Sequence, residues 1–176
     1  GAAVMIDYIG GPPEETLAKI KQAGGNAQAT KADVSDPGQV QNLIAATCKA
    51  FGKIDILVNN AGIEYKHPFV DFPLELWHKV IAVDLTGPFL CAQGVAKQMI
   101  QQGKGGRIIN ISSIHEDLPM PTNAPYCAAK GGLRMLMRTI AVELAPHQIT
   151  VNNIGPGAIY TPIDKEIESN PTIEKP

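Results

Sequence analysis

The chain has 176 residues, of which 44% are hydrophobic and 18% charged, and its net charge is −2. This length and composition are typical of one globular α/β domain with room for a core. No basic run or aromatic-basic patch indicates nucleic acid as a partner, and no apolar run or leader pattern indicates a membrane. The three cysteines lack CxxC spacing, which indicates reduced thiols, so we expect a cytoplasmic protein.

Strand-like and helical segments alternate along the chain, which predicts a parallel sheet covered by helices on both faces. The strands are expected at residues 2–7, 27–31, 54–59, 107–112 and 150–154. The helices are expected at residues 14–23, 37–51, 73–102 and 125–145. We expect residues 1–176 to form a single domain, with no internal repeat.

Three local signals refine this pattern. Asp36 can cap the helix that begins at Pro37, and Gln39 completes a capping-box-like pattern. The near-continuous apolar run at 54–59 predicts a strand buried on both faces. The pair at 87–88, Gly-Pro, predicts a kink near Asp84 in the long helical region.

The chemistry centres on Ser113, Tyr126 and Lys130. Tyr126 and Lys130 are four residues apart in a helical pattern and therefore share one face. A free phenol titrates near pH ~10, and a neighbouring ammonium lowers that pKa towards neutrality. Ser113 ends a strand-like run and can hold a carbonyl or alcohol oxygen beside the phenol. The three residues predict a proton-transfer site for a C–O group; the competing interpretation is an exposed helix pair.

Further motifs accompany these residues in a fixed order, and together they resemble the classical short-chain dehydrogenases/reductases. The motifs, in chain order, are Asp33-Val34, Asn59-Asn60-Ala61-Gly62, Ser113, Tyr126-x-x-x-Lys130 and Pro156-Gly157. The resemblance implies a Rossmann-type, doubly wound parallel sheet in a three-layer α/β/α arrangement. It also implies a nicotinamide dinucleotide and reversible hydride transfer between a secondary alcohol and a ketone.

The resemblance also implies roles for individual residues. Tyr126 would be the acid/base, Lys130 would lower its pKa and bind the nicotinamide ribose, and Ser113 would orient the substrate oxygen. The implied dinucleotide contacts are Asp33, Val34, Asn59, Ala61, Gly62, Tyr126, Lys130, Pro156, Gly157, Ile159 and Thr161. Taken singly, the Asn59-Asn60-Ala61-Gly62 motif is equally compatible with an ordinary strand-to-turn, Pro156-Gly157 alone favours a plain turn, and Asp33 alone favours a solvated loop carboxylate.

Within the family, the residues after Ser112 and those from Asn152 to Ile163 look most like bacterial glucose 1-dehydrogenases. That likeness implies oxidation of the anomeric C–OH of glucose. His115 and Glu116, which follow the catalytic serine, could meet sugar hydroxyls or form a solvated loop. Alternatives are reduction of 3-oxoacyl or other ketones, and a non-catalytic Rossmann-like scaffold. The remaining histidines show no ligand spacing, so no metal site is expected.

The chain departs from the family pattern in three respects. Asp84 stands where the family usually has asparagine, and a buried carboxylate there could perturb the titration of Tyr126 and Lys130. The family's first strand and Gly-rich turn, and its last strand, are not found in the sequence. We therefore expect a gap in the sheet between the first and third strands, and a partial domain of a longer, homotetrameric protein. Asp7-Tyr8 at the end of the first strand favours NAD over NADP without deciding between them.

Overall fold

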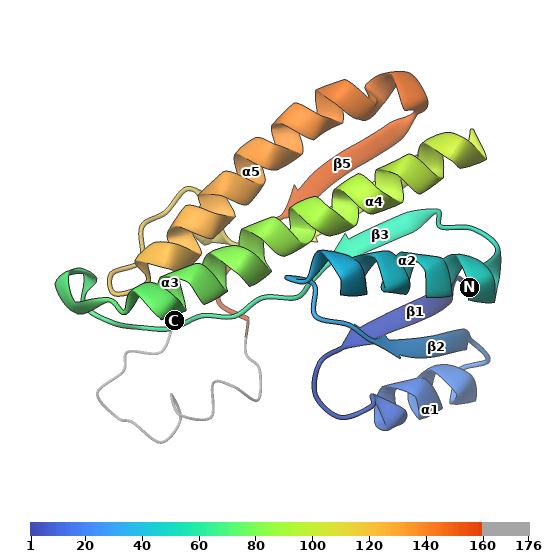
Figure 1. Ribbon diagram of the computed structural model, residues 1–176, viewed down its shortest axis with the longest axis horizontal. Helices are drawn as coiled ribbons and strands as arrows, with labels where there is room; N and C mark the ends of the chain where they lie inside the picture. Colours follow the sequence, from blue (N-terminus) through green and yellow to red (C-terminus); the bar gives the residue numbers. More distant parts are fainter. Residues whose placement is uncertain (160–176) are drawn as a thin grey trace.

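The computed structural model describes residues 1–159, which form an α/β fold whose strands are all parallel (Figure 1). The strands are β1 (Ala3–Tyr8), β2 (Asn26–Lys31), β3 (Ile56–Asn59), β4 (Gly106–Ile111) and β5 (Ile149–Ile154). The helices are α1 (Glu14–Gln22), α2 (Pro37–Phe51), α3 (Leu74–Ile81), α4 (Gly87–Gln102) and α5 (Ala124–Leu144). Every strand and helix expected from the sequence is present, with ends that move by one or two residues.

The strands form two groups that do not pair with each other. β1 pairs with β2, and β3, β4 and β5 form a second sheet in that order. The described residues thus confirm the predicted gap, because β1 and β3 would be neighbours of one missing strand. Each of these two strands has an edge whose backbone groups bind no strand among residues 1–159.

The start and end of α2 follow from its sequence. The Asp36 carboxylate accepts a hydrogen bond from the backbone N–H of Gln39 at 2.9 Å, and Pro37 occupies the first turn. Gly52 ends the helix with φ of 78°, a conformation that favours glycine. The expected capping box is wrong in one detail: the Gln39 side chain accepts from the backbone N–H of Asp33, not of Asp36. It therefore ties α2 to the loop after β2.

The core of the larger sheet lies on one face, under α2, α4 and α5, which run on the same side of the strands (Figure 1). Its fully buried side chains include Met99 of α4, Ile108 of β4 and Ile149 of β5. A smaller cluster of Val34, Val40 and Cys91 joins α2 to α4. These contacts fix the positions of α4 and α5 over the strands.

The opposite face of the larger sheet is open among the described residues. Ile56 and Val58 of β3 are 53% and 51% exposed, and Ile154 of β5 is 52% exposed. The prediction that both faces of β3 are buried is therefore wrong for residues 1–159, because all the helices that pack on β3 lie on one side. An apolar run alone does not distinguish a strand covered twice from one covered once.

The long helical region is interrupted as expected, but by a wider turn instead of a simple kink. Ala82–Thr86 forms a π-helical turn between α3 and α4. Pro88 has no N–H to donate, and Gly87 lies so close to Val34 that an added Cβ would be 2.9 Å from Val34 Cγ2. The π-helical turn places Asp84 facing the interior, where it is fully buried.

Candidate active site

The predicted proton-transfer residues meet at the carboxyl ends of β3 and β4. Ser113 lies two residues after β4, and Tyr126 and Lys130 lie on the first turns of α5. The carboxyl ends of parallel strands are where α/β proteins bind ligands, because the connecting loops converge there. The structure therefore brings together three residues that are separated by up to 17 positions in the sequence.

Lys130 is held by three groups from three different elements. Its Nζ donates to the Ile111 carbonyl at 3.2 Å, lies 3.3 Å from Asp84 Oδ2, and lies 5.2 Å from the centre of the Tyr126 ring. The residue is 4% exposed. An ammonium has three protons, so these two polar partners leave one donor that can bind a further group.

The pKa of Tyr126 moves in the direction opposite to the one predicted from Lys130. Burial is the largest cause and raises the pKa, while the nearby Ser113 hydroxyl lowers it. The negative charges of Asp84 and Glu64, and the Cys127 thiol, raise it further. The physical reason for the difference is chiefly the burial of the phenol, to which the negative charge of Asp84 adds.

Ser113 has an extended backbone, and its Oγ accepts from the backbone N–H of His115 at 3.2 Å. His115 lies beside Tyr126, with ring centres 6.4 Å apart in an edge-to-face arrangement. The His115 Nδ1 is 3.0 Å from the Leu118 carbonyl oxygen. The structure thus groups Ser113, His115 and Tyr126, the three residues predicted to face the substrate.

Residues after β5 run beside the Ser113 loop. The backbone N–H of Ile114 donates to the Pro156 carbonyl at 3.0 Å, and a Cβ added to Gly157 would lie 4.0 Å from Ile114 Cγ2. This places Pro156 and Gly157 beside the loop that follows Ser113, whereas Ile159 is 62% exposed. Thr161, also predicted to contact the dinucleotide, lies outside the described residues.

The other predicted dinucleotide contacts have structural partners of their own. The Asp33 carboxylate accepts from the backbone N–H and the hydroxyl of Ser35, at 2.9 and 2.6 Å. Val34 is buried in the cluster between α2 and α4. Ala61 and Gly62 are exposed, and an added Cβ on Gly62 would lie 3.0 Å from Asp84 Oδ2. The same Cβ would lie 3.7 Å from Lys130 Nζ, so Gly62 is adjacent to both members of the Asp84–Lys130 pair.

Sequence reasoning missed a row of asparagines across the larger sheet. Asn59, Asn110 and Asn153 occupy the same register on β3, β4 and β5. Asn59 Nδ2 donates to Asn110 Oδ1, and Asn110 Nδ2 donates to Asn153 Oδ1, each at 2.9 Å. Asn153 Nδ2 donates to Glu116 Oε2 at 3.0 Å. We name these three residues the asparagine ladder.

The asparagine ladder gives Asn59 and Glu116 structural partners. The Asn59 side-chain amide is hydrogen-bonded to Asn110 within the protein. The Glu116 carboxylate also lies 3.8 Å from the Arg134 guanidinium of α5. A signal for the ladder was present in the sequence, because each of three strands carries an asparagine at or near its carboxyl end. A second missed pair is Asn123, fully buried, and Glu64, whose Oε2 accepts from Asn123 Nδ2 at 2.8 Å.

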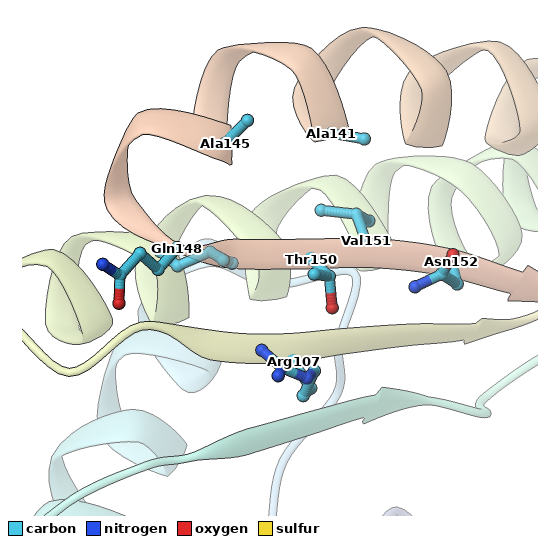
Figure 2. Close-up of a pocket in the computed structure, with 8 residues that line it drawn as sticks. Arg107, Ala141, Ala145, Gln148, Thr150, Val151 and Asn152 are labelled. Atoms are coloured by element: carbon cyan, nitrogen blue, oxygen red, sulfur yellow. The ribbon is translucent and has the colours of Figure 1, made fainter.

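A surface hollow of about 470 Å³ lies away from these residues, along β5 and the end of α5. Figure 2 shows its lining, with Ala141 and Ala145 on the helix and Arg107, Thr150 and Asn152 on the strands. It contains none of the predicted site residues. A second hollow, of about 270 Å³, opens beside the start of α5 and includes His67, Phe69 and Cys127.

Two further features of residues 1–159 bear on the site. No group of three or more His, Cys, Asp or Glu side chains in this range is placed to hold a metal ion. No helix in the same range has both the length and the hydrophobicity needed to span a bilayer.

Comparison with known proteins places these residues in a family. A family model described as short chain dehydrogenase matches residues 1–172. The chain is 40% identical over 168 residues to the 5-keto-D-gluconate 5-reductase of Escherichia coli strain K12, a match that covers 95% of this chain and 66% of that protein. The chain spans 60–66% of the length of the curated relatives it matches.

Two solved structures are similar throughout the described fold. The acetoin dehydrogenase of Salmonella typhimurium superimposes with a TM-score of 0.87 at 42% identity, over 93% of this chain and 65% of that one. A gluconate 5-dehydrogenase of Burkholderia cenocepacia J2315, solved with NADP and tartrate, gives a TM-score of 0.88 at 36% identity, over 97% of this chain and 67% of that one.

Proposed function

The chain belongs to the short-chain dehydrogenase/reductase family, and we propose that it carries the proton-transfer centre of an NAD(P)-dependent oxidoreductase for sugars or small alcohols. The observation that carries the proposal is the meeting of Ser113, Tyr126 and Lys130 at the carboxyl ends of β3 and β4. A buried ammonium beside a phenol and a serine hydroxyl fits general acid/base chemistry at a C–O group.

The residues of the chain have separate tasks in this mechanism. The Tyr126 hydroxyl gives a proton to a carbonyl oxygen, or takes one from an alcohol, and the Ser113 hydroxyl holds the same oxygen. The remaining Lys130 proton suits a ribose hydroxyl. A nicotinamide dinucleotide supplies the hydride chemistry when bound. The protein therefore contributes orientation and a placed proton.

For the substrate, we propose a polyhydroxylated alcohol, with glucose oxidised at its anomeric carbon as the first candidate. His115 beside Tyr126 offers a ring nitrogen to a sugar hydroxyl. The similar proteins named for keto-gluconate and acetoin support a small polar substrate in general. They also favour the second candidate, reduction of a ketone by the same residues.

We further infer NAD as the preferred dinucleotide, because Asp7 lies one residue before the end of β1 and the residues from Tyr8 through Gly11 include no cation. The related gluconate 5-dehydrogenase was solved with NADP, so both dinucleotides belong in the test. A homotetramer and a cytoplasmic location complete the proposal. The free thiols of Cys48, Cys91 and Cys127 suit a reducing compartment.

The test is a panel of glucose, gluconate, 5-keto-gluconate, acetoin and a 3-oxoacyl ester, each assayed with NAD and with NADP. Oxidation or reduction of the dinucleotide is monitored by the absorbance of its nicotinamide. The intact protein is compared with Tyr126→Phe, Ser113→Ala and the matched control Ser112→Ala, whose Oγ has no partner in the structure. Loss of the acid/base should lower kcat/KM by about 10²–10⁴-fold. Ser112→Ala should retain activity.

Each outcome separates two possibilities. Activity that survives in Tyr126→Phe rules out the proposed acid/base. Binding of neither dinucleotide by the intact protein would favour the scaffold alternative. A higher kcat/KM for ketones than for glucose would select the reductase assignment and leave the site residues unchanged.

A further inference from the structure

Asp84 is a fully buried carboxylate beside the proposed acid/base pair. It lies on the π-helical turn between α3 and α4. Its Oδ1 accepts from the backbone N–H of Ile63 at 2.9 Å, and its Oδ2 lies 3.3 Å from Lys130 Nζ. Oδ2 has no well-aligned hydrogen bond in the structure, so the contact with Lys130 is chiefly ionic.

Few other charged groups face this pair among the described residues. On α5 they are Lys130 itself, Tyr126 and the Cys127 thiol. On the loop after β3, Glu64 acts on both Asp84 and Tyr126, but its side chain is 46% exposed and Lys66 lies 3.6 Å away. From β4 only the Ile111 carbonyl oxygen reaches Lys130. Asp84 is therefore the buried counter-charge of Lys130.

The packing around Asp84 prevents it from turning away. Its side chain has no exposed surface, and Gly62 leaves just enough space for the carboxylate. The Ile63 N–H holds one oxygen, which directs the other towards Lys130. The pair is thus a fixed feature of the site and not a passing surface contact.

We propose that Asp84 is a positioning residue that neutralises Lys130 and so keeps Tyr126 protonated at neutral pH, which favours carbonyl reduction there and alcohol oxidation in alkaline solution. This inference rests on the proposed function. In the reducing direction a bound reduced dinucleotide would supply the hydride to the carbonyl carbon and be oxidised, and the Tyr126 hydroxyl would give its proton to the carbonyl oxygen. The resulting phenolate then takes a proton from solvent.

The argument is one of charge. Burial raises the pKa of the Asp84 carboxyl, while the Ile63 N–H and the Lys130 ammonium lower it and so favour its ionised form. With Asp84 ionised, Asp84 and Lys130 together have no net charge, whereas asparagine at this position would leave the full ammonium beside the phenol. An unopposed positive charge within ~4–6 Å favours the phenolate and lowers its pKa by about 1–3 units. The raised pKa of Tyr126, to which Asp84 contributes after burial, agrees with this direction.

The test compares pH profiles of kcat/KM for oxidation and reduction in the intact protein and in Asp84→Asn. In Asp84→Asn, the pH at which kcat/KM for oxidation rises should be lower by about one unit than in the intact protein. The value of kcat/KM for oxidation at pH 7 should therefore be about tenfold higher. The pH at which kcat/KM for reduction declines should be lower by the same amount. The matched control is Asp55→Asn, which removes a 56% exposed carboxylate next to the amino end of β3 and should move neither limb. An Asp84→Asn profile that coincides with that of the intact protein overturns the proposal.

A second measurement does not depend on Asp84→Asn folding or on turnover. The ultraviolet difference titration of the intact protein against Tyr126→Phe reports ionisation of Tyr126 alone. Tyr126 should ionise above the ordinary tyrosine value of about 10. Ionisation below that value overturns the inference even if the enzyme is active. Failure of the intact protein to turn over any substrate would instead refute the proposed function. The titration can still contradict the charge argument, and its support requires that Tyr126 ionise at a lower pH in Asp84→Asn than in the intact protein.

Discussion

The asparagine ladder makes a measurable contribution to stability, and Asn110 at its centre is the residue to change. Asn110 is 2% exposed, and its side chain makes two hydrogen bonds, one to each neighbouring strand. Asn110→Ala removes both. It leaves Asn59 Nδ2 with only a 3.4 Å contact to the Pro88 carbonyl, and it leaves Asn153 Oδ1 without this donor.

The expected cost follows from these contacts. Each net hydrogen bond contributes about 1 kcal/mol, and a buried amide left without its partner costs about 1–3 kcal/mol more. Most of that penalty arises at Asn59, which is 9% exposed, because Asn153 is only half-buried and can form a hydrogen bond with water instead. We therefore expect Asn110→Ala to lower the free energy of unfolding by about 3 kcal/mol.

The assay is urea unfolding of the intact protein, with Asn152→Ala as the matched control. Asn152 is exposed on β5, next to Asn153, and its side chain makes no hydrogen bond to any other residue in the range 1–159. Its change should cost less than about 0.5 kcal/mol. Asn110→Asp should also destabilise, because a carboxylate can accept from Asn59 but cannot donate to Asn153. Equal costs for Asn110→Ala and Asn152→Ala would refute the reasoning.

Two further predictions concern other parts of the fold. Gly62→Ala should lower the free energy of unfolding by about 1–3 kcal/mol, because the added Cβ would lie 3.0 Å from Asp84 Oδ2, which is held in place. The control Gly10→Ala should cost much less, because no atom lies within 4 Å of its added Cβ. Equal shifts of the melting temperature in the two variants would contradict this prediction. Asp36→Ala should lower the melting temperature at pH 7. Its hydrogen bonds with Gln39 lower the pKa of Asp36, so its contribution is present above the ordinary carboxyl value and is lost as the pH falls through the lowered folded value. The melting temperatures of the parent and Asp36→Ala should therefore converge in acid, and a constant difference down to pH 2 would contradict the assignment.

The elements were predictable where local signals agree with tertiary packing. The cap at Asp36, the proline at position 37 and the glycine at position 52 define α2 without any distant contact. The start of β3 was less predictable. Ile54 is apolar and buried, but both its backbone polar groups bind the side chain of Gln102, so pairing with β4 begins only at Ile56.

The sequence placed Ser113, Tyr126 and Lys130 together and singled out Asp84 as a carboxylate that could perturb them, but it gave the wrong direction for the pKa of Tyr126. The spacing of Tyr126 and Lys130 sets their shared helix face, because four residues make about one turn. The net effect on Tyr126 depends on Asp84, which lies on a different helical segment 42 positions before it in the sequence. Helix periodicity cannot place Asp84, since the π-helical turn at 82–86 changes which face its side chain occupies.

The two polar networks act on different loops of the candidate site. The asparagine ladder reaches Glu116 and fixes the turn that follows Ser113, while Asp84 links the loop after β3, through Ile63, to Lys130 on α5. Ser113 and Tyr126 are therefore positioned by separate sets of contacts. It follows that changes in the asparagine ladder should alter the placement of the substrate oxygen and hence KM, whereas changes at Asp84 should alter the pH at which the proton moves. This division is what makes the two networks separable by experiment.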